Sequence, residues 1–369
     1  MLTYIFIAFI VLVFIQCTYY LVFLFSLGLK KSKVIQKPFN KPVSVLICAK
    51  NEEDNLKNLL PYFEKQTYKN FQLVLINDCS TDNTLNVLKS FKENSSLNIK
   101  IVDVELVEQF WGNKKYALTL GIKAASNEHL LFIDADCEPI SNKWIKEMVS
   151  TFSSEKQIVL GYGAYEKVKN SFLNKIIRFE TLLTAIQYFS YAKIGTPYMG
   201  VGRNLAYTKS LFFSVNGFIN HMNIKSGDDD LFINSVATSK NTAICISKKS
   251  FTKSVPKKTF KEWFLQKRRH VSTAKHYKTA HKFILGLFYI SQIGFWFLAI
   301  LLLLFQHNWQ LTTGFIVFRY LILYVTLAIL AKRFKEKDLV VFFPLFEIFL
   351  ILSQFTIFIK NSISKPTHW

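Results

Sequence analysis

The sequence has only five cysteines among 369 residues, and no two of them have the C-x-x-C spacing of a zinc finger or a redox pair. Single, scattered thiols are typical of a reducing compartment and argue against a disulfide-stabilised secreted domain. Histidine is also scarce, and its seven residues show no metal-binding spacing. The sequence contains no internal repeat.

Acidic residues are scarce as well, because 25 Asp and Glu stand against 46 Lys and Arg, which gives a net charge of +21. Half of the residues are nevertheless hydrophobic, a composition that excludes an intrinsically disordered chain. A nucleic-acid-binding protein can be equally basic, but it does not need long uncharged apolar runs. We therefore expect a membrane protein, with membrane lipids as partners and no nucleic acid.

Residues 4–29 contain no charged side chain. About 20 apolar residues in a helix span the hydrocarbon core of a bilayer, so this run predicts a transmembrane helix. It lacks the basic start and the cleavage site of a signal peptide. Three other candidate spans lie at residues 283–305, 312–331 and 339–359. The last of these contains Pro344 and Glu347, which makes it the least typical of the four.

Loop charges predict the orientation of these spans. The loop 331–338 holds four basic residues, whereas residues 306–310 hold none. This bias favours a multi-pass protein of the inner membrane with residues 30–282 in the cytoplasm. The same scheme puts Lys360 and Lys365 outside, against the charge rule. The lysines that follow the first span are Lys30, Lys31, Lys33, Lys37 and Lys41.

The region between residues 42 and 165 alternates between apolar runs and helical patterns. This alternation predicts an α/β fold with a mostly parallel sheet and helices on both faces. Ligands of such sheets bind beyond the carboxyl ends of the strands. The strands are predicted at 43–49, 71–77, 99–106, 129–134 and 157–163. The helices are predicted near 53–65, 82–93, 114–125 and 142–153.

Two further helical patterns follow this region. Residues 170–195 are too charged to span a bilayer, so they lie on the membrane surface or pack on the domain. Residues 257–282 hold nine Lys or Arg beside one Glu, which suits an anionic membrane face. The predicted units are an N-terminal span (1–29), a cytoplasmic α/β domain (30–255), basic interfacial helices (256–282) and three C-terminal spans (283–369).

The segment HLLFIDADCEP (129–139) ends a buried strand with two carboxylates, Asp134 and Asp136. A buried carboxylate is costly unless a positive group meets it. Mg²⁺ or Mn²⁺ would meet this need, because hard cations bind carboxylate oxygens and share the phosphates of a substrate. The alternative is a solvated turn, which the position at a strand end disfavours.

Polar residues also follow the first two predicted strands. Asp78 ends the second strand, where it can accept hydrogen bonds from a base or a ribose. Asn51 and Glu52 follow the first strand, and the alternative to a binding role is that they only cap the next helix. The alternative role of Asp82 is to brace its own loop.

Two lysines begin the helix predicted at 114–125. A cation is unfavourable at the start of a helix, so Lys114 indicates an anionic ligand. Lys115 beside it is interpreted as a solvated residue.

These motifs form an ordered set that resembles the membrane-bound glycosyltransferases of family 2. The set covers about residues 43–282. It includes the Q-x-x-R-W signature, which reads QKRRH (266–270) in this sequence. Its other members are AKNEE (49–53), DCSTD (78–82), KKYAL (114–118), DAD (134–136), GVGRNLAY (200–207) and SGDDDL (226–231).

The resemblance implies a GT-A nucleotide-sugar-binding fold and assigns roles to individual residues. A divalent cation, Mg²⁺ or Mn²⁺, would be held by Asp134 and Asp136. The donor would contact Ala49, Asn51, Glu52, Asp78, Lys114, Asp134 and Gln266. The acceptor side would include Gly202, Arg203, Asn204 and His270, which stands where the family has Trp.

The acidic cluster would supply the catalytic base, which deprotonates the acceptor hydroxyl as it attacks. Counting back from Leu231 favours Asp228, but Gly227 replaces the Glu of the usual E-D-x-x-L pattern, which leaves Asp229 as the alternative. A further interpretation is that the three adjacent acids form a helix cap in which only one of them is functional. Arg269 would contact the diphosphate, and its alternative role is in a basic patch at the membrane surface.

The implied activity is an inverting, metal-dependent transfer of a sugar from a nucleotide sugar, such as a UDP-sugar, to a lipid or saccharide hydroxyl at the inner membrane face. Such enzymes build polysaccharides or glycolipids of the bacterial envelope. A polyprenyl-phosphate sugar synthase is the alternative enzyme, although such enzymes lack the Q-x-x-R motif. A non-catalytic scaffold is the third reading, but it would have no reason to retain costly acids at strand ends.

Overall fold

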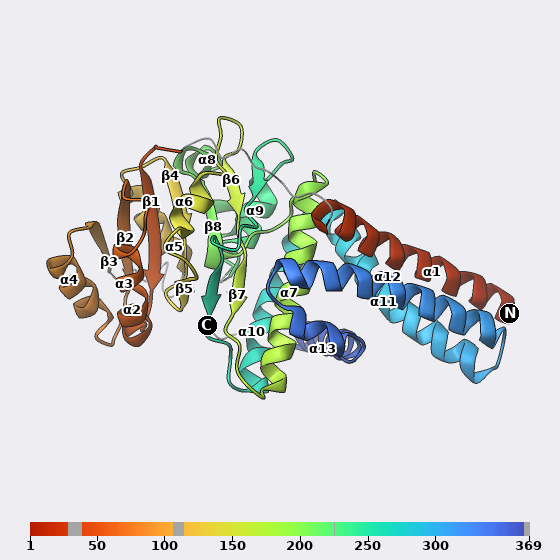
Figure 1. Cartoon of the computed structure of the whole chain (residues 1–369). Coiled ribbons are helices and arrows are strands. Elements are labelled where there is room, and N and C mark those ends of the chain that lie inside the picture. The colour runs from red at the N-terminus through yellow and green to blue at the C-terminus, as the bar shows by residue number, and fades with distance from the viewer. Residues whose placement is uncertain (29–38, 106–113, 225, 365–369) are drawn as a thin grey trace.

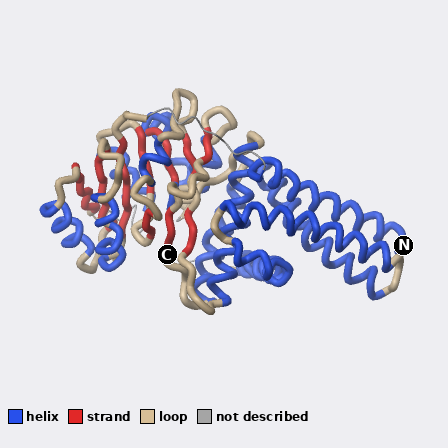
Figure 2. Tube along the Cα trace, in the orientation of Figure 1, coloured by secondary structure: helices blue, strands red, loops and turns tan. Residues whose placement is uncertain are grey.

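The computed structural model describes residues 1–28, 39–105, 114–224 and 226–364. An α/β domain lies at one side of the molecule, and long helices project from it (Figure 1, Figure 2). Lys30, Lys31, Lys33, Lys37 and Lys365, on which part of the predicted orientation rests, lie outside the described residues.

The centre of the α/β domain is a seven-stranded sheet in the order β3-β2-β1-β4-β8-β6-β9. Strands β3, β2, β1 and β4 are parallel, and β8 runs antiparallel to both of its neighbours. The predicted mostly parallel sheet is confirmed. Its strands are β1 (Val43–Ala49), β2 (Phe71–Asp78), β3 (Asn98–Val104), β4 (His129–Phe132), β6 (Ile158–Leu160), β8 (Leu205–Thr208) and β9 (Thr242–Ile244).

The strand predicted at 157–163 is shorter than expected, because the chain leaves the sheet at Gly161 and continues in a second sheet of order β5-β10-β7. A Cβ at Gly161 would lie 2.5 Å from the side chain of Asn204, so only glycine lets these segments approach. The strands of the second sheet are β5 (Cys137–Pro139), β7 (Gly163–Tyr165) and β10 (Thr252–Ser254).

Helices cover both faces of the large sheet, as predicted. Val43, Val45 and Ile47 of β1 pack in a core with the helices that follow β1 and β5. Leu46, from the opposite face of the strand, packs in a core with α5. The helices are α2 (Glu53–Leu59), α3 (Pro61–Glu64), α4 (Thr84–Asn94), α5 (Lys114–Ala124), α6 (Trp144–Val149), α8 (Lys209–Ser214) and α9 (Asp230–Val236).

Two amphipathic helices lie between this domain and the projecting helices (Figure 1). Helix α7 (Phe172–Lys193) buries residues along its whole length, so the pattern at 170–195 packs on the domain. Helix α10 (Phe260–Thr273) lies against it, because Lys267 and the indole of Trp263 both bind the Glu180 carboxylate, at 2.6 and 3.3 Å.

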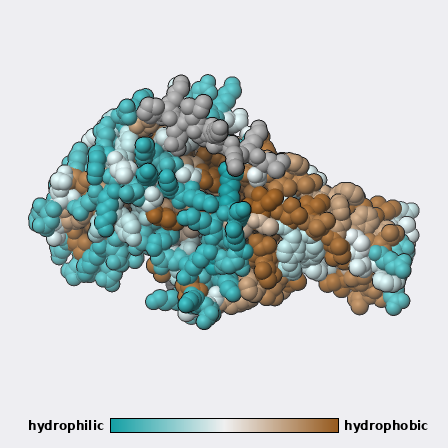
Figure 3. Space-filling model, viewed as in Figure 1, coloured by the Kyte–Doolittle hydropathy of each residue, from teal (hydrophilic) through white to brown (hydrophobic). Residues whose placement is uncertain are grey.

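Among the described residues, four helices are long and apolar enough to cross a membrane, and they are the four predicted from the sequence. They are α1 (Leu2–Phe23, continued by a π-helical turn to Gly28), α11 (Thr279–Leu304), α12 (Trp309–Arg333) and α13 (Phe343–Ile363). The surface of the projecting helices is largely hydrophobic, whereas the surface of the α/β domain is largely hydrophilic (Figure 3). Inside the bundle, the buried Arg319 guanidinium binds the Glu347 carboxylate and donates to Gln16 Oε1 at 3.3 Å. This network ties α1, α12 and α13 together.

A second buried ion pair ties the loop between α12 and α13 to the α/β domain. Arg178 of α7 donates to Glu336, and both side chains are about 3% exposed. The same guanidinium binds Asp338 at 2.7 Å. The 331–338 loop therefore lies against the α/β domain.

We expect Glu336→Ala to destabilise the protein by about 3–5 kcal/mol, because it leaves the buried Arg178 without its main counter-charge. Asp338→Ala is the matched control. The Asp338 carboxylate is 44% exposed, so solvent screens its pair with Arg178 and we expect a smaller loss, close to the ~0–1 kcal/mol of an exposed pair. Thermal unfolding of the detergent-solubilised protein measures both changes. Equal effects of the two variants would contradict a specific contribution of the buried pair.

Candidate active site

The predicted site lies at the carboxyl ends of β1, β2 and β4, where two loops are joined by side-chain hydrogen bonds. Asn51 adopts a φ of 55°, and its Oδ1 accepts a hydrogen bond from the Thr81 amide at 2.8 Å. The backbone N–H of Asn51 in turn donates to Ser80 Oγ at 3.0 Å. Ala49 is the last, buried residue of β1. Asn51 therefore fixes the loop after β1 to the loop after β2.

Two acids near this junction have different roles. Asp82 accepts hydrogen bonds from the amides of Thr84 and Glu53, at 3.0 and 3.4 Å, so it braces its loop. The Glu52 amide donates to Thr84 Oγ1, while its carboxylate accepts from Asn55. Burial raises the pKa of Glu52, and the nearby acids of the DAD segment raise it further.

Asp78 is the last residue of β2 and is 7% exposed. Burial raises the pKa of its carboxyl, although Lys50 and Lys114 oppose this shift. Within the described ranges, no hydrogen-bond donor approaches its carboxylate closely enough to bind it. Its oxygens are therefore available to a ligand at the edge of the sheet.

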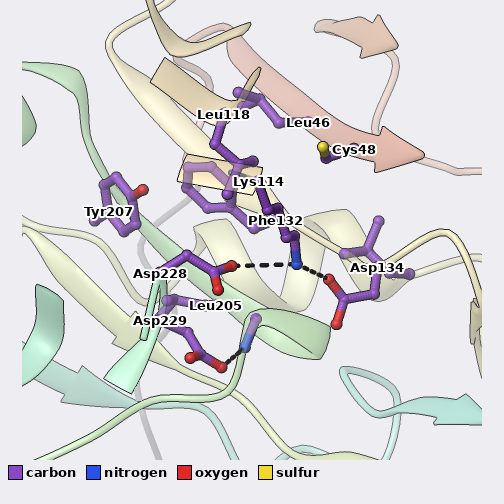
Figure 4. Close-up of a pocket in the computed structure, with 12 residues that line it drawn as sticks. Leu46, Cys48, Lys114, Leu118, Phe132, Asp134, Leu205, Tyr207, Asp228 and Asp229 are labelled. Carbon is purple, nitrogen blue, oxygen red and sulfur yellow. Dashed lines mark hydrogen bonds and ion pairs between the residues drawn. The ribbon is translucent and has the colours of Figure 1, made fainter. Parts of the chain in front are cut away.

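Lys114, the first residue of α5, joins two loops of the site. Its Nζ lies 2.8 Å from Asp134 Oδ1 and 3.1 Å from Asp228 Oδ2 (Figure 4). Burial alone lowers the pKa of Lys114, but the two carboxylates outweigh it and raise this pKa well above its usual range. The sequence placed an anionic ligand at Lys114, and the structure brings two acids to it.

The three adjacent acids of SGDDDL make three different sets of contacts. Asp229 is the N-cap of α9, and its carboxylate accepts hydrogen bonds from the amides of Gly202 and Asp230, both at 2.7 Å. Asp230 accepts from Thr273 Oγ1 at 2.5 Å and from the Tyr277 hydroxyl at 2.6 Å. Asp228 instead faces Lys114 in the pocket, which Asp229 and Gly202 also line (Figure 4).

The charges of these acids follow from their partners. Burial raises the pKa of Asp228, but Lys114 outweighs it and holds this pKa below its usual range. Among the described residues, Asp229 forms no ion pair, and Lys114 lowers its pKa only weakly. Burial and its two acidic neighbours raise its pKa to about 7. Lys114 therefore favours the ionised form of Asp228, while the Asp229 carboxylate caps α9.

Lys115 is not solvated, and the interpretation from sequence was wrong. Its side chain is fully buried, and its ammonium donates to the backbone carbonyls of His221 and Ile224, at 2.7 and 2.8 Å. Burial lowers its pKa to about 8. These carbonyls belong to the loop that leads directly into Asp228. The first two residues of α5 thus contact both Asp228, through Lys114, and the loop that carries Asp228, through Lys115.

We expect Lys115→Met to reduce kcat by about 10²-fold with little change in KM, because a misplacement of about 1 Å near the reacting atoms has this effect. Lys209→Met is the matched control. The Lys209 ammonium also binds two backbone carbonyls, those of Lys123 and Ala125, but at the other end of α5. Lys115→Arg should restore part of the rate. Equal losses in the Lys115 and Lys209 variants would contradict this role.

The residues predicted on the acceptor side are only partly at the pocket. Gly202 lines it. The Arg203 guanidinium donates to Ala164 O and Ser254 Oγ, and lies 4.4 Å from the centroid of the Tyr165 ring. Arg203 thus fastens its segment to the second sheet.

Asn204 requires a correction, because its side chain is completely buried. Its Oδ1 accepts from the Trp144 indole at 3.1 Å, and its Nδ2 donates to the carbonyls of Tyr162 and Ser250. All of its hydrogen-bonding groups are used inside the domain, so it has a structural role and does not face an acceptor. The sequence gives no signal that separates it from its neighbour Arg203.

The QKRRH residues lie on α10. Gln266, Arg269, His270 and Thr273 are spaced at three and four residues, so they share one side of the helix. Thr273 on this side binds Asp230, which attaches α10 to the acidic cluster. Arg268 points elsewhere and binds the C-terminal end of α13. The sequence did not identify Thr273 and Tyr277, because such residues carry no chemical signature by themselves.

The DAD segment has a donor set that fits a hard divalent cation. Ligand atoms of Asp134, Asp136 and Cys137 lie within 4.8 Å of one another. Carboxylate oxygens suit Mg²⁺ or Mn²⁺, whereas a thiol suits softer metals. Asp136 is exposed, and one oxygen of Asp134 is bound to Lys114. The two carboxylates can therefore hold a divalent cation with Asp136 as the more open ligand.

Comparison with known proteins decides the family. Residues 44–216 match the model of glycosyl transferase family 2. This region is a family 2 glycosyl transferase domain. The match contains β1, the DAD segment and β8 of the large sheet, so the predicted family and the predicted GT-A fold are confirmed.

The glycosyl transferase domain has curated bacterial relatives. It is 32% identical over 113 residues to a poly-β-1,6-N-acetyl-D-glucosamine synthase of Staphylococcus epidermidis, which covers 27% of this chain and 26% of that one. It is 30% identical over 129 residues to a UDP-Glc:α-D-GlcNAc-diphosphoundecaprenol β-1,3-glucosyltransferase of Escherichia coli, which covers 35% of this chain and 47% of that one. The match thus spans about a quarter to a half of these relatives.

The fold of the whole chain is similar to that of a mannosyltransferase from Pyrobaculum calidifontis, solved in complex with GDP-Man and Mn²⁺. The TM-score is 0.63 at 17% identity, and the match covers 99% of this chain and 100% of that one. The arrangement of the glycosyl transferase domain and its long helices is therefore shared with a solved protein.

Proposed function

We propose that this protein is an inverting glycosyltransferase that moves a sugar from a nucleotide sugar, such as a UDP-sugar, to a hydroxyl of a lipid or saccharide acceptor at a membrane. The observation that carries the proposal is the Asp134–Lys114–Asp228 cluster at the carboxyl edge of the sheet. It puts a candidate ligand of a metal, a cation for a diphosphate and an acid for a hydroxyl within one pocket.

The donor lies along the sheet edge. Asp78 and the Asn51 loop surround the nucleoside, while Asp134 and Asp136 hold Mg²⁺ or Mn²⁺ beside the diphosphate. The bound cation supplies positive charge that stabilises the departing nucleoside diphosphate. The relatives from Staphylococcus epidermidis and Escherichia coli are named for transfer of N-acetylglucosamine and glucose units, which supports a hexose donor.

Asp228 acts as the base. Its ion pair with Lys114 keeps it ionised but makes it a weak proton acceptor. A diphosphate draws the Lys114 ammonium toward itself, because its charge is larger than that of one carboxylate. Asp228 then loses the partner that lowers its pKa and accepts the proton of the attacking hydroxyl. A single displacement of this kind inverts the anomeric carbon.

The QKRRH side of α10 completes the pocket from the membrane side. Gln266 and Arg269 face the donor diphosphate, and His270 takes the position of the family's Trp next to the acceptor. Thr273 and Tyr277 support this arrangement because both bind Asp230, next to Asp228 and Asp229. The excess of basic residues on the 331–338 loop and on α10 favours the cytoplasmic face of the inner membrane for the glycosyl transferase domain.

The test is release of nucleoside diphosphate by the detergent-purified protein. UDP-, GDP- and dTDP-sugars are offered with Mg²⁺ or Mn²⁺, with and without a bacterial lipid extract. We expect release from one donor that needs the cation and increases with the extract. Absence of release from every donor by folded protein, with lipid extract and saccharide acceptors present, would overturn the proposal.

A further inference from the structure

Helix α13 is long and apolar enough to cross a membrane, yet its first half is fastened to α7. The Phe179 ring of α7 lies 5.8 Å from that of Phe343 and 5.3 Å from that of Phe346. The loop just before α13 carries Glu336, which pairs with Arg178 of α7. The start of α13 therefore lies beside the glycosyl transferase domain, and Glu347 in its next turn contacts Arg319 in the middle of α12.

The C-terminal end of α13 is fastened to the same domain, through α10. Arg268 donates to Ser364 O at 2.6 Å and to Asn361 Oδ1 at 2.9 Å. The Asn361 amide group donates back to Arg268 O at 3.0 Å. Arg268 is itself 7% exposed, so this contact is enclosed. A crossing helix would instead carry these residues to the opposite side of the bilayer.

Helix α10 cannot follow α13 across a membrane, because it is attached to the glycosyl transferase domain at several points. Its middle binds Glu180 of α7, and its last residue, Thr273, binds Asp230 beside the pocket. The other three helices run away from this domain, whereas α13 is seen nearly along its axis (Figure 1). Arg333 binds Leu27 O, which joins the domain-side ends of α12 and α1.

Thr356, Lys360 and Ser362 are exposed near the end of α13, but the longest part of its exposed face is apolar. It is an uncharged stripe at helical spacing, and the opposite face packs on α7, α10 and α11. The stripe consists of Leu345, Ile348, Leu352, Phe355, Ile359 and Ile363. Exposed apolar residues also cover α1, α11 and α12, and the projecting helices are largely hydrophobic (Figure 3), so all four helices present surface that suits lipid acyl chains.

We infer that α13 lies in the plane of the membrane, in the leaflet next to the glycosyl transferase domain, with its apolar stripe against the acyl chains. The chain then crosses the bilayer three times, through α1, α11 and α12. Lys360 comes to the domain side, where the other loop lysines and arginines are, which removes the exception to the charge rule. Pro344 and Glu347 are the sequence features that set this helix apart from a regular span.

The test is labelling of single added cysteines in sealed membrane vesicles with a membrane-impermeant maleimide. Ser362→Cys reports the end of α13, Lys92→Cys the glycosyl transferase domain, and Trp309→Cys the far end of α12. All three positions are exposed, and the parent protein gives the background of its native thiols. A protease site added after Trp369 gives a second reading of the same end.

We expect Ser362→Cys and the added protease site to react in the vesicles in which Lys92→Cys reacts, and Trp309→Cys to react in vesicles of the opposite orientation. Reaction of the α13 end together with Trp309→Cys would show a fourth crossing and overturn the inference. If Ser362→Cys is shielded by lipid on both sides, the protease site decides between the two arrangements. The result does not depend on activity.

Discussion

Asp228→Asn is expected to lower kcat by about 10²–10⁴-fold, the usual contribution of a general base. Asn has nearly the same shape but cannot accept the proton of the acceptor hydroxyl. Donor binding should persist or tighten, because the substitution releases Lys114 from one of its two carboxylates and leaves its charge for the diphosphate. Turnover and donor binding, measured separately on the same protein, show whether only the chemical step is lost.

Asp229→Asn is the matched control for this prediction. Its carboxylate caps α9 and accepts two amide hydrogen bonds, and Asn is an equally good N-cap, so we expect a small change in stability with most of the turnover retained. The comparison separates the two acids that the sequence left open. A larger loss of turnover in Asp229→Asn than in Asp228→Asn would assign the base to Asp229.

Asp136→Asn is expected to abolish metal-dependent donor binding and to reduce turnover by at least about 10³-fold. An amide has no negative charge for a hard cation, and the remaining ligand, Asp134, shares one oxygen with Lys114. Electron paramagnetic resonance of Mn²⁺ reports the loss of cation binding directly, without need of activity. Removal of the cation from the unchanged protein with a chelator should have the same effect on donor binding.

Glu138→Gln is the control for Asp136→Asn. Glu138 is two residues away, but its carboxylate binds the Tyr62 hydroxyl at 2.9 Å and Lys253 at 3.1 Å. We expect Mn²⁺ binding and turnover close to those of the unchanged protein. Unchanged Mn²⁺ binding by Asp136→Asn would exclude this residue as a metal ligand.

The sequence by itself determined the first strands and helices of the α/β domain, the long apolar helices and the edge of the sheet at which the candidate site lies. The strands at β1 and β2 and the four long apolar helices were predicted within a few residues, because burial and periodicity are local properties of the chain. The meeting of Asp78, Asp134 and the Asn51 loop at one edge also followed from sequence, since parallel strands end together at that edge. The DAD segment was identified because a buried strand that ends in two acids is costly without a cation.

Only the tertiary structure decided which partners each residue of the candidate site contacts. Asp230 is bound by Thr273 and Tyr277, which lie 43 and 47 residues further along the chain. Lys115 binds carbonyls more than 100 residues away. The side chain of Asn204 was placed inside the domain by contacts with three separate segments. Such partners leave no local pattern in the sequence.

The course of α13 shows the same limit for the membrane part. Its length and composition are those of a span, and hydropathy depends only on the residues of the helix itself. Its direction depends on Arg268 and Phe179, which belong to other helices and hold its two ends on one side. Local sequence thus fixed which segments are helical and apolar, whereas contacts between distant segments decided how this helix lies and which acid meets Lys114.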